Sequence, residues 1–356
     1  NLPEDIEYLR FLGNRVAVAI ALASKRLKPS EISFGNGWLD GYSFCRIYKM
    51  KDGSLRTNPY SQYKDSIVEP YRDIDKTVQV IEIKQEGKIT GILVNFICHC
   101  DVVGSETGIS ADFPGELRRC LKEKYGKDVI VLYLQGACGN INHYDVFHWN
   151  VTSVPHRYKE IGKALADEVE KIMKDMKIAE SDNLGGIERK IIVKLQKPDE
   201  KLISWMKKTI AETAEDMGGL GRFEKEQVDL YFAKQAMGAH TSGITDRKTT
   251  LQVLNIAELG IYASPGELFQ EFADELIAKS PFKRTFVSAY SNDYIGYIVT
   301  PDLCRVDGVY EGRQTSSRTF EKEAGPDMNR EFLKMGEELF KNRNKSVRDI
   351  TRTVYS

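Results

Sequence analysis

The sequence of 356 residues lacks the features of membrane-spanning and nucleic-acid-binding proteins. Its best apolar run, residues 16–22, is much shorter than the roughly 20 residues that span a bilayer. The 51 Lys and Arg residues are balanced by 52 Asp and Glu residues and interleaved with them, so they form no concentrated positive face for phosphate groups. We therefore expect a globular protein without a transmembrane segment and without nucleic acid as its main partner.

Cysteine and histidine are also scarce. The six cysteines follow no spacing typical of a disulfide framework, so buried free thiols are the simplest interpretation. There are only five histidines, which limits the imidazole groups available as metal ligands or catalytic bases. Any chemistry that needs histidine must therefore use one of a few positions.

Apolar residues make up 41% of the chain, enough for a folded core, and the sequence has no internal repeat, low-complexity tract or flexible linker. The patterns predict helices at 5–25, 114–125, 155–176, two within 202–237, one opening at Glu267, and one at 329–341. They predict strands within 32–58 and at 77–84, 89–98, 128–134, 187–195, 251–259 and 285–290, and a polar loop at 311–328. We expect an α/β fold: a single large domain with a mixed β-sheet core flanked by helices.

His99 lies at the end of the apolar strand GILVNFICHC, residues 91–100. Active groups in α/β proteins gather at strand ends, although a core histidine held by a hydrogen bond explains this position equally well. The flanking Cys98 and Cys100 point to the opposite face of a strand from His99, so we do not expect a Cys/His zinc cluster here.

The segment VIVLYLQGACGNINHYD, residues 129–145, reads as a buried strand that runs into a turn. Gly136 and Gly139 allow the backbone to approach a ligand, and exposed N–H groups in such a turn can bind an anion or a carbonyl oxygen. A tight strand exit without any function would use the same residues. The turn is followed by Asn142 and His143, which are further polar candidates.

The residues Gln135 to Gly139 also resemble the Q-A-C-x-G turn of caspase-type peptidases, with Cys138 as the nucleophile and His99 upstream. The glutamine is one residue too far from the cysteine, and the histidine lies closer in sequence than in that motif. A cysteine peptidase that uses Cys138 and His99 is therefore an alternative hypothesis.

Glu267 follows a break at Pro265-Gly266 and is predicted in the first turn of a helix, where the helix dipole stabilises a carboxylate. The same position can place a metal ligand beyond a strand end. Tyr294 and Tyr297 occur in the loop SNDYIGYIVT, residues 291–300, where packing and hydrogen bonding are both common roles for tyrosine.

Taken in order, these segments resemble the neutral/alkaline non-lysosomal ceramidase family, particularly its shorter bacterial relatives. The resemblance covers nearly all of the chain and rests on FCRIYKMKDGSLRTNP, VNFICHC, GISADFPGEL, LQGACGNIN, SPGELFQEFADEL, SNDYIGYIVT and VYEG. It implies a zinc-dependent amide hydrolase of lipid metabolism that acts on a small N-acyl or lipid-like molecule such as a sphingolipid. It also suggests a secreted or periplasmic location, and a homo-oligomer is compatible with it.

The resemblance also assigns roles to individual residues. His99 corresponds to the family's second zinc histidine, Glu267 to its glutamate ligand and Tyr297 to its tyrosine ligand. Tyr310 corresponds to the tyrosine that contacts substrate. Zinc accepts nitrogen and oxygen ligands, lowers the pKa of bound water towards roughly 7 and polarises an amide carbonyl, which suits such a reaction.

Three departures from the family pattern shape the prediction. The family's first zinc histidine lies in an H-T-H-S-G-P type segment before the helix with which this sequence begins. Asn142 stands where the family has a functional serine; it can donate a hydrogen bond to a carbonyl but cannot act as a nucleophile. No segment matches the C-terminal β-sandwich of the long family members, so residues 1–356 correspond to the N-terminal hydrolase domain.

These departures make ceramide itself an unexpected substrate, and they motivate a third hypothesis, a non-catalytic binding protein on the same fold. Arg46, Asp112, Gly136, Gly139 and His143 complete the candidates as substrate-binding residues. Arg46 can pair with an anionic substrate group or, more commonly, with an acidic neighbour. Asp112 can instead be a helix cap before Phe113-Pro114.

Overall fold

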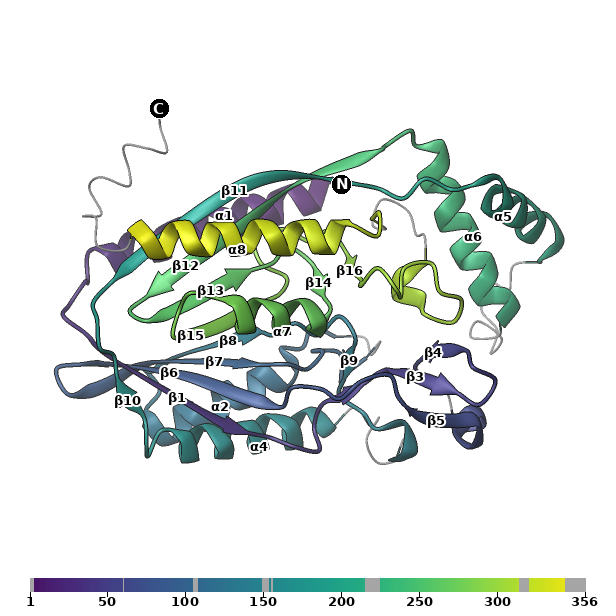
Figure 1. Cartoon of the computed structure of the whole chain (residues 1–356). Helices are drawn as coiled ribbons and strands as arrows, with labels where there is room; N and C mark the ends of the chain where they lie inside the picture. Colours follow the sequence, from purple (N-terminus) through teal and green to yellow (C-terminus); the bar gives the residue numbers. More distant parts are fainter. Residues whose placement is uncertain are drawn as a thin grey trace.

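The computed structural model describes residues 3–59, 61–104, 108–148, 154, 156–214, 225–313 and 320–342. In this part of the chain two β-sheets lie face to face, and each carries helices on its outer side (Figure 1). Both sheets are mixed, because each combines antiparallel pairs with one parallel pair. The predicted α/β fold with a mixed-sheet core flanked by helices is confirmed.

The first sheet has the strand order β10 (Lys177–Ile178), β1 (Glu31–Trp38), β6 (Thr77–Gln85), β7 (Lys88–Phe96) and β8 (Ile130–Gln135). The helices α2 (Asp112–Tyr125) and α4 (Arg157–Ile172) cover its outer face (Figure 1). The strands predicted at 77–84 and 89–98 are confirmed as β6 and β7, which pair as an antiparallel hairpin. The prediction that the strand after residue 128 is buried was wrong: β8 is an edge strand, with Ile130 61% and Leu132 49% exposed.

The second sheet has the order β11 (Leu184–Lys194), β12 (Asp246–Ile256), β13 (Leu259–Ala263) and β15 (Arg284–Ser288). It is covered by α7 (Gln270–Lys279) and α8 (Ala324–Asn342). The single strand predicted at 251–259 is two strands, because the backbone turns at Ala257, which has a φ of +54°. The closing helix also begins earlier than predicted, at Ala324.

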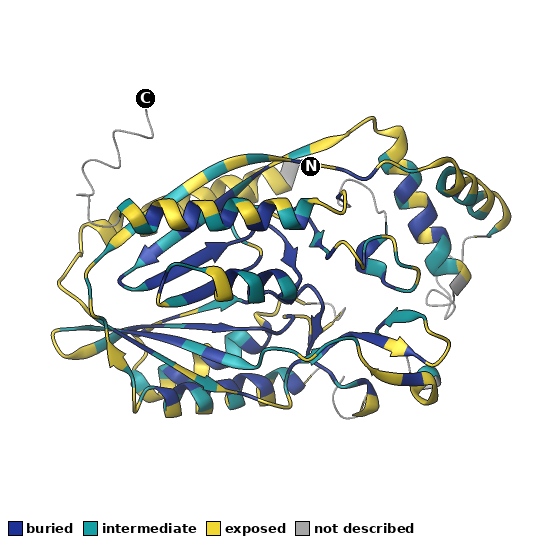
Figure 2. Cartoon of the chain, in the orientation of Figure 1, coloured by how far each residue is buried: buried dark blue, intermediate teal, exposed yellow. Residues whose placement is uncertain are grey.

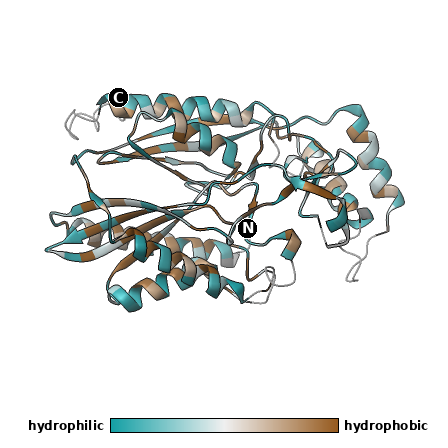
Figure 3. Cartoon of the chain, turned by 60° about the horizontal axis from the view of Figure 1, so that its bottom comes forward, coloured by the Kyte–Doolittle hydropathy of each residue, from teal (hydrophilic) through white to brown (hydrophobic). Residues whose placement is uncertain are grey.

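Apolar side chains fill the space between the two sheets, including Phe34, Ile81, Leu259, Ile261 and Phe286. Buried residues line the strands and the inner sides of the helices (Figure 2), and apolar residues follow the same surfaces (Figure 3). The side-chain amide of Asn95 in β7 donates to the carbonyl oxygens of Leu134 at 2.9 Å and Val287 at 3.2 Å, which ties the two sheets together.

This link brings four strand ends to one place. The backbone N–H of Gly136 after β8 donates to Phe96 at the end of β7, at 2.9 Å. The N–H of Ala289 after β15 donates to Gln135 at the end of β8, at 2.8 Å, and the N–H of Ser264 after β13 donates to Ser288 at 2.7 Å. Ligand sites in α/β proteins lie beyond the carboxyl ends of parallel strands, so this edge is where a site is expected.

Several small elements surround that edge. They are the paired strands β2 (Phe44–Cys45) and β9 (Ile141–Asn142), the pair β14 (Glu267–Leu268) and β16 (Tyr297–Ile298), and the sheet of β3 (Ile47–Met50), β4 (Leu55–Thr57) and β5 (Ile67–Pro70). The described residues also form the short 3₁₀ helices η1 (Ser61–Ser66), η2 (Val146–His148) and η4 (Tyr310–Gly312). A helical hairpin of α5 (Glu200–Glu212) and α6 (Lys225–Thr241) stands at one end of the molecule (Figure 1).

The helix predicted at 5–25 is present as α1 (Pro3–Ser24), but residues 5–24 are all exposed, including apolar side chains such as Leu9 and Val16. Its apolar residues therefore do not form part of the core. No helix in the described ranges is both long enough and apolar enough to cross a membrane.

Candidate functional site

Glu267 follows β13 but does not begin a helix, so that prediction was wrong. It lies in the two-residue strand β14, directly opposite Tyr297 in the parallel strand β16. The backbone N–H of Glu267 donates to Gly296 at 2.8 Å and that of Phe269 to Ile298 at 3.1 Å, and α7 starts only at Gln270. The carboxylate is therefore positioned by a strand ladder and not by a helix dipole.

His99 lies just beyond β7 and contacts Glu267 through its Nε2 atom. Its Nδ1 lies 2.7 Å from the carbonyl oxygen of Ile141 and its Nε2 lies 3.0 Å from Oε2 of Glu267. A carbonyl oxygen only accepts hydrogen bonds, so Nδ1 carries a proton and Nε2 is the atom that faces the carboxylate. Both side chains are buried. Two acceptor atoms repel each other at this distance, so a proton or a bound cation must lie between Nε2 and Oε2.

The pKa values of this pair are displaced in opposite directions. Burial disfavours a charged His99, but Cys138 and the hydrogen bond to Glu267 outweigh it and raise the pKa of His99 to about 10. Burial also disfavours an ionised Glu267, but hydrogen bonds from His99, Tyr294 and Tyr297 lower its pKa to about 2. Without a metal the two groups form an imidazolium–carboxylate pair across the neutral pH range.

Four tyrosines surround this pair. The hydroxyl of Tyr294 donates to Oε1 of Glu267 at 2.5 Å, and the hydroxyl of Tyr290 lies 3.3 Å from Nε2 of His99. The rings of Tyr290 and Tyr294 stack at 5.9 Å. Tyr297 hydrogen-bonds to Glu267, and its hydroxyl lies 3.2 Å from that of Tyr310. Tyr290 is 39% and Tyr294 38% exposed, so the site opens to solvent on the side of these two rings.

Arg46 packs against the rings of Tyr297 and Tyr310. Its guanidinium is 5.2 Å from the ring centre of Tyr297 and 5.1 Å from that of Tyr310. Its Nε forms a 2.7 Å ion pair with Glu311, although the angle is not that of a well-aligned hydrogen bond, and Nη2 donates to the carbonyl of Gly139 at 2.5 Å. The side chains of Arg46 and Glu311 are 2% and 0% exposed. Arg46 therefore has an acidic neighbour in the protein and supports the two tyrosines.

Asn142 lies in β9, one residue after the carbonyl that holds His99. Its side-chain amide donates to Oδ1 of Asn58 at 2.6 Å and is buried. The next residue, His143, has Nδ1 2.8 Å from Oδ1 of Asp101. Burial opposes ionisation of Asp101, but the hydrogen bond from His143 and the charge of His99 lower the pKa of Asp101 to about 2.

Asp112 binds backbone groups at the start of α2. Its Oδ1 accepts from the N–H of Phe113 at 2.7 Å and its Oδ2 from the N–H of Val103 at 3.0 Å. Both carboxylate oxygens are thus used to hold the helix start against the preceding loop. Asp112 is the first residue of α2, and the N-cap residue Ala111 has no side-chain cap bond, so the helix-cap interpretation of Asp112 was wrong.

Gly136 and Gly139 allow close packing of the turn after β8. A Cβ at Gly136 would lie 2.9 Å from the carbonyl oxygen of Phe96, and one at Gly139 would lie 2.5 Å from the carbonyl oxygen of Glu267. Neither glycine has a positive φ. The two glycines therefore let this turn fit between the ends of β7 and β14, which keeps His99 and Glu267 close together.

Cys138 lies in the same turn, and its thiol is 3.7 Å from the hydroxyl of Tyr290 and within hydrogen-bonding reach of His99. Cys138 is completely buried. Tyr290 itself was missed by the sequence analysis. It follows β15 with a φ of +53°, and the sequence offers no signal for this left-handed backbone because a bulky aromatic residue rarely adopts it.

The donors at this site fit a zinc ion in part. Within the described residues, no three or more His, Cys, Asp or Glu side chains are grouped in a way that could hold a metal ion. The imidazole of His99, the carboxylate of Glu267 and the hydroxyl of Tyr297 do converge, and nitrogen and oxygen donors of these kinds bind zinc. Three protein donors with a free position are typical of catalytic zinc sites.

The fold and this strand-end site define an α/β protein with a mixed-sheet core and a cluster of buried polar residues beyond the ends of its strands. No family model matches the chain, and no curated protein sequence matches it at a significant level. Among solved structures it is similar to neutral ceramidase from Pseudomonas aeruginosa, with a TM-score of 0.60 and 14% identity over 91% of this chain and 54% of that chain. It is also similar to a ceramidase complexed with C2, with a TM-score of 0.59 and 14% identity over 90% of this chain and 55% of that chain.

The chain thus has the fold of one part of these ceramidases and spans about half of their length. At 14% identity the similarity establishes the fold.

Proposed function

We propose that this protein is a zinc-dependent hydrolase of an amide (N-acyl) or related acyl bond. The observation that carries the proposal is the 3.0 Å contact between Nε2 of His99 and Glu267, two buried groups that need a proton or a cation between them. The similarity of the fold to neutral ceramidases supports the choice of reaction. The departure at Asn142 favours an N-acyl substrate other than ceramide.

His99, Glu267 and Tyr297 would hold the zinc ion. The bond from Nδ1 of His99 to the carbonyl of Ile141 fixes the tautomer that leaves Nε2 available, as is usual for histidine ligands of metals. When bound, zinc supplies a Lewis acid that polarises a carbonyl and makes water a better nucleophile near neutral pH.

The remaining residues would bind and orient the substrate. Burial raises the pKa of Tyr290, so its hydroxyl stays protonated and can donate to the oxygen of a substrate carbonyl as negative charge develops there. Tyr310 is held against Tyr297 by Arg46 and is available as a second contact. Asp101 orients His143, as a carboxylate orients an imidazole that transfers protons.

The test is zinc analysis together with turnover of a panel of N-acyl amides that differ in head group. We expect about one zinc per chain and turnover of at least one amide, and we expect His99→Ala and Glu267→Ala to lose both. His148→Ala is the matched control, because His148 is an exposed histidine. Absence of zinc and of turnover in the parent chain would refute the proposal.

A cysteine peptidase is the second candidate, and the contact of the Cys138 thiol with His99 and Tyr290 favours it. The complete burial of Cys138 argues against attack on a peptide. Cys138→Ser separates the two functions: a peptidase would lose activity, whereas a zinc hydrolase would lose activity on chelation and keep it in this variant.

The third hypothesis, a binding protein without catalysis, rests on Asn142 in place of a serine. The side-chain amide of Asn142 donates to Asn58, and in the described part of the chain Asn142 forms no side-chain hydrogen bond with His99. Such a protein would bind an N-acyl amide and return it unchanged. Release of a free carboxylic acid from any member of the panel would eliminate this hypothesis.

A further inference from the structure

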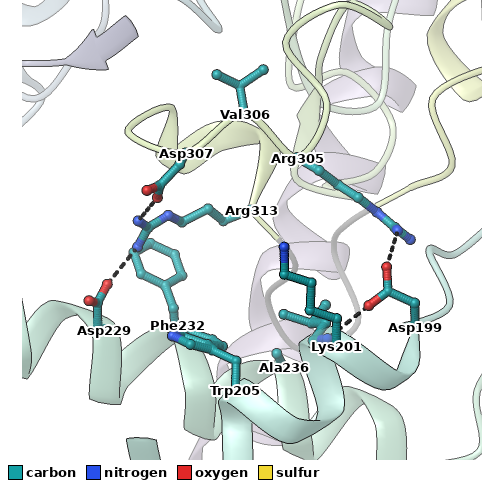
Figure 4. A pocket seen from close by; sticks show the side chains of 11 residues that line it. Asp199, Lys201, Trp205, Asp229, Phe232, Ala236, Arg305, Val306, Asp307 and Arg313 are labelled. Atoms are coloured by element: carbon teal, nitrogen blue, oxygen red, sulfur yellow. Dashed lines mark hydrogen bonds and ion pairs between the residues drawn. The ribbon is translucent and has the colours of Figure 1, made fainter. Parts of the chain in front are cut away.

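A second cavity lies away from the His99–Glu267 pair, between the helical hairpin α5–α6 and the segment 305–313. It has a volume of about 410 Å³, which is within the range of small-molecule pockets, roughly 300–1,000 Å³. Figure 4 shows side chains from both helices and from that segment around the cavity.

The floor and walls of the cavity are mostly apolar. Leu202 and Trp205 come from α5, Phe232 and Ala236 from α6, and Val306 from the opposite segment. Phe232 and Ala236 are buried. Two aromatic rings and short aliphatic groups form a surface that suits a hydrocarbon chain.

Two arginines connect the hairpin to the opposite segment and frame this apolar space (Figure 4). Arg313 lies 3.2 Å from Asp229 on α6 and 2.6 Å from Asp307, and its guanidinium is 5.0 Å from the ring centre of Phe232. Arg305 lies 3.8 Å from Asp199 at the start of α5. Each aspartate that lines the cavity is therefore paired with an arginine.

Lys201 is the remaining charged residue of the lining. Its ammonium group points into the space between the hairpin and the segment 305–307 (Figure 4), and it forms no ion pair with any residue that the structure describes. An unpaired cation beside an apolar surface complements a molecule with an apolar body and an anionic end.

We propose that this cavity binds a single-chain amphiphile with a carboxylate head, with the hydrocarbon chain between Trp205 and Phe232 and the carboxylate at Lys201. This binding does not depend on the proposed function. The two fit together, because hydrolysis of a fatty N-acyl amide releases such a carboxylate. The segment 305–313 also carries Tyr310 and Glu311, which contact Arg46, so an occupant would touch the same segment that forms part of the candidate site.

The test is titration calorimetry of the whole chain with decanoate, decanol and decylammonium, below their micelle concentrations and with a chelator present. We expect one decanoate per chain, about tenfold weaker binding of decanol, and no binding of decylammonium. Lys201→Gln should weaken the binding of decanoate about three- to fivefold, as expected for loss of a partly exposed ion pair, and should leave the affinity for decanol unchanged. Lys207→Gln is the matched control, because Lys207 is on the same helix but does not line the cavity.

Two further variants locate the binding. Ala236→Phe fills the cavity and should abolish binding of both decanoate and decanol, with circular dichroism to confirm the helices. Trp205→Phe should keep binding but remove the change in tryptophan fluorescence that decanoate causes. The proposal is overturned if decanoate does not bind at millimolar concentration, if decylammonium binds as tightly, or if Lys201→Gln and Lys207→Gln behave alike. Because the chelator prevents zinc-dependent turnover, these results are independent of the proposed hydrolase activity.

Discussion

The two sites of this molecule use charge in opposite ways. At the strand-end site, charged groups are buried and paired with each other: His99 with Glu267, and Arg46 with Glu311. At the hairpin cavity, Asp307 and the pair of Arg305 with Asp199 lie largely in solvent, the pair of Arg313 with Asp229 is mostly buried, and much of the lining is apolar. A buried charge that loses its partner is strongly destabilising, whereas an exposed pair contributes little. The difference predicts large effects at the first site and small ones at the exposed pairs of the second.

The largest effect on stability is expected for Glu311→Gln. This change leaves the buried guanidinium of Arg46 without its carboxylate, which should lower the free energy of unfolding by about 3–5 kcal/mol. Urea unfolding of the purified variant measures it. Glu69→Gln is the matched control: it removes an exposed pair with Lys49 and should cost no more than about 1 kcal/mol. Equal effects of the two variants would show that the buried pair has no special role.

A large effect on activity is expected for Tyr290→Phe. Loss of the hydroxyl beside His99 should lower kcat by about 10²-fold, the lower end of the effect of removing one donor to a developing oxyanion. Zinc content and thermal stability should hardly change. Tyr231→Phe, an exposed tyrosine on α6, is the control. If Tyr290→Phe keeps full kcat, the assignment of Tyr290 as a substrate contact is wrong.

A moderate effect is expected from pH on the metal-free chain. The pKa of Glu267 is lowered from 4.5 to about 2, so its stabilising contribution is complete above pH 4.5 and is lost as the pH falls to 2. The pKa of His99 is raised from 6.5 to about 10, so its contribution is complete below pH 6.5 and is lost as the pH rises to 10. The contribution of this pair should therefore be greatest between pH 4.5 and 6.5.

The same pKa of His99 predicts proton release when zinc binds. At pH 7 the Nε2 atom of the metal-free chain is protonated, so it must lose this proton to become a ligand. Calorimetry in two buffers of different ionisation enthalpy should detect release of at least one proton per zinc. Addition of zinc to the metal-free His99→Ala variant should release no such proton.

The smallest effect is expected for Asp307→Asn at the rim of the hairpin cavity. The side chain of Asp307 is 92% exposed, and Arg313 keeps Asp229 as a partner. The free energy of unfolding should change by less than about 1 kcal/mol. In urea unfolding, the midpoint for Asp307→Asn should shift no more than the midpoint for Glu69→Gln. A loss comparable to that of Glu311→Gln would mean that the rim pairs hold the hairpin in place.

Most of the fold could be predicted from local patterns, because most strands and helices have long, regular spacing of apolar residues. The hairpin of β6 and β7 and the position of His99 beyond β7 follow from such spacing. Glu267 could not be placed correctly, since a two-residue strand has no periodicity and the backbone N–H of Glu267 donates to the carbonyl of Gly296, which is distant in sequence. The apolar pattern of β8 gave no sign that it is an edge strand.

The candidate site was predictable only in part for the same reason. Gly136 and Gly139 were predicted as possible ligand contacts, but the structure explains these glycines by close backbone packing against Phe96 and Glu267. The sequence alone left open whether Arg46 pairs with an anionic substrate group or with an acidic side chain. The fold decides this, because it brings Arg46 next to Glu311, which lies 265 residues later in the sequence. The position of the Tyr290 side chain depends on a left-handed backbone conformation. A tyrosine rarely adopts this conformation, so the sequence does not indicate it.

The most direct test of the central claim is a crystal structure of the zinc-loaded protein with anomalous scattering at the zinc edge. The account predicts one zinc ion about 2.0–2.2 Å from Nε2 of His99 and from oxygen atoms of Glu267 and Tyr297. It also predicts that the direct contact of 3.0 Å between His99 and Glu267 is replaced by contacts to the metal. Zinc bound elsewhere, with His99 and Glu267 still in direct contact, would contradict the account.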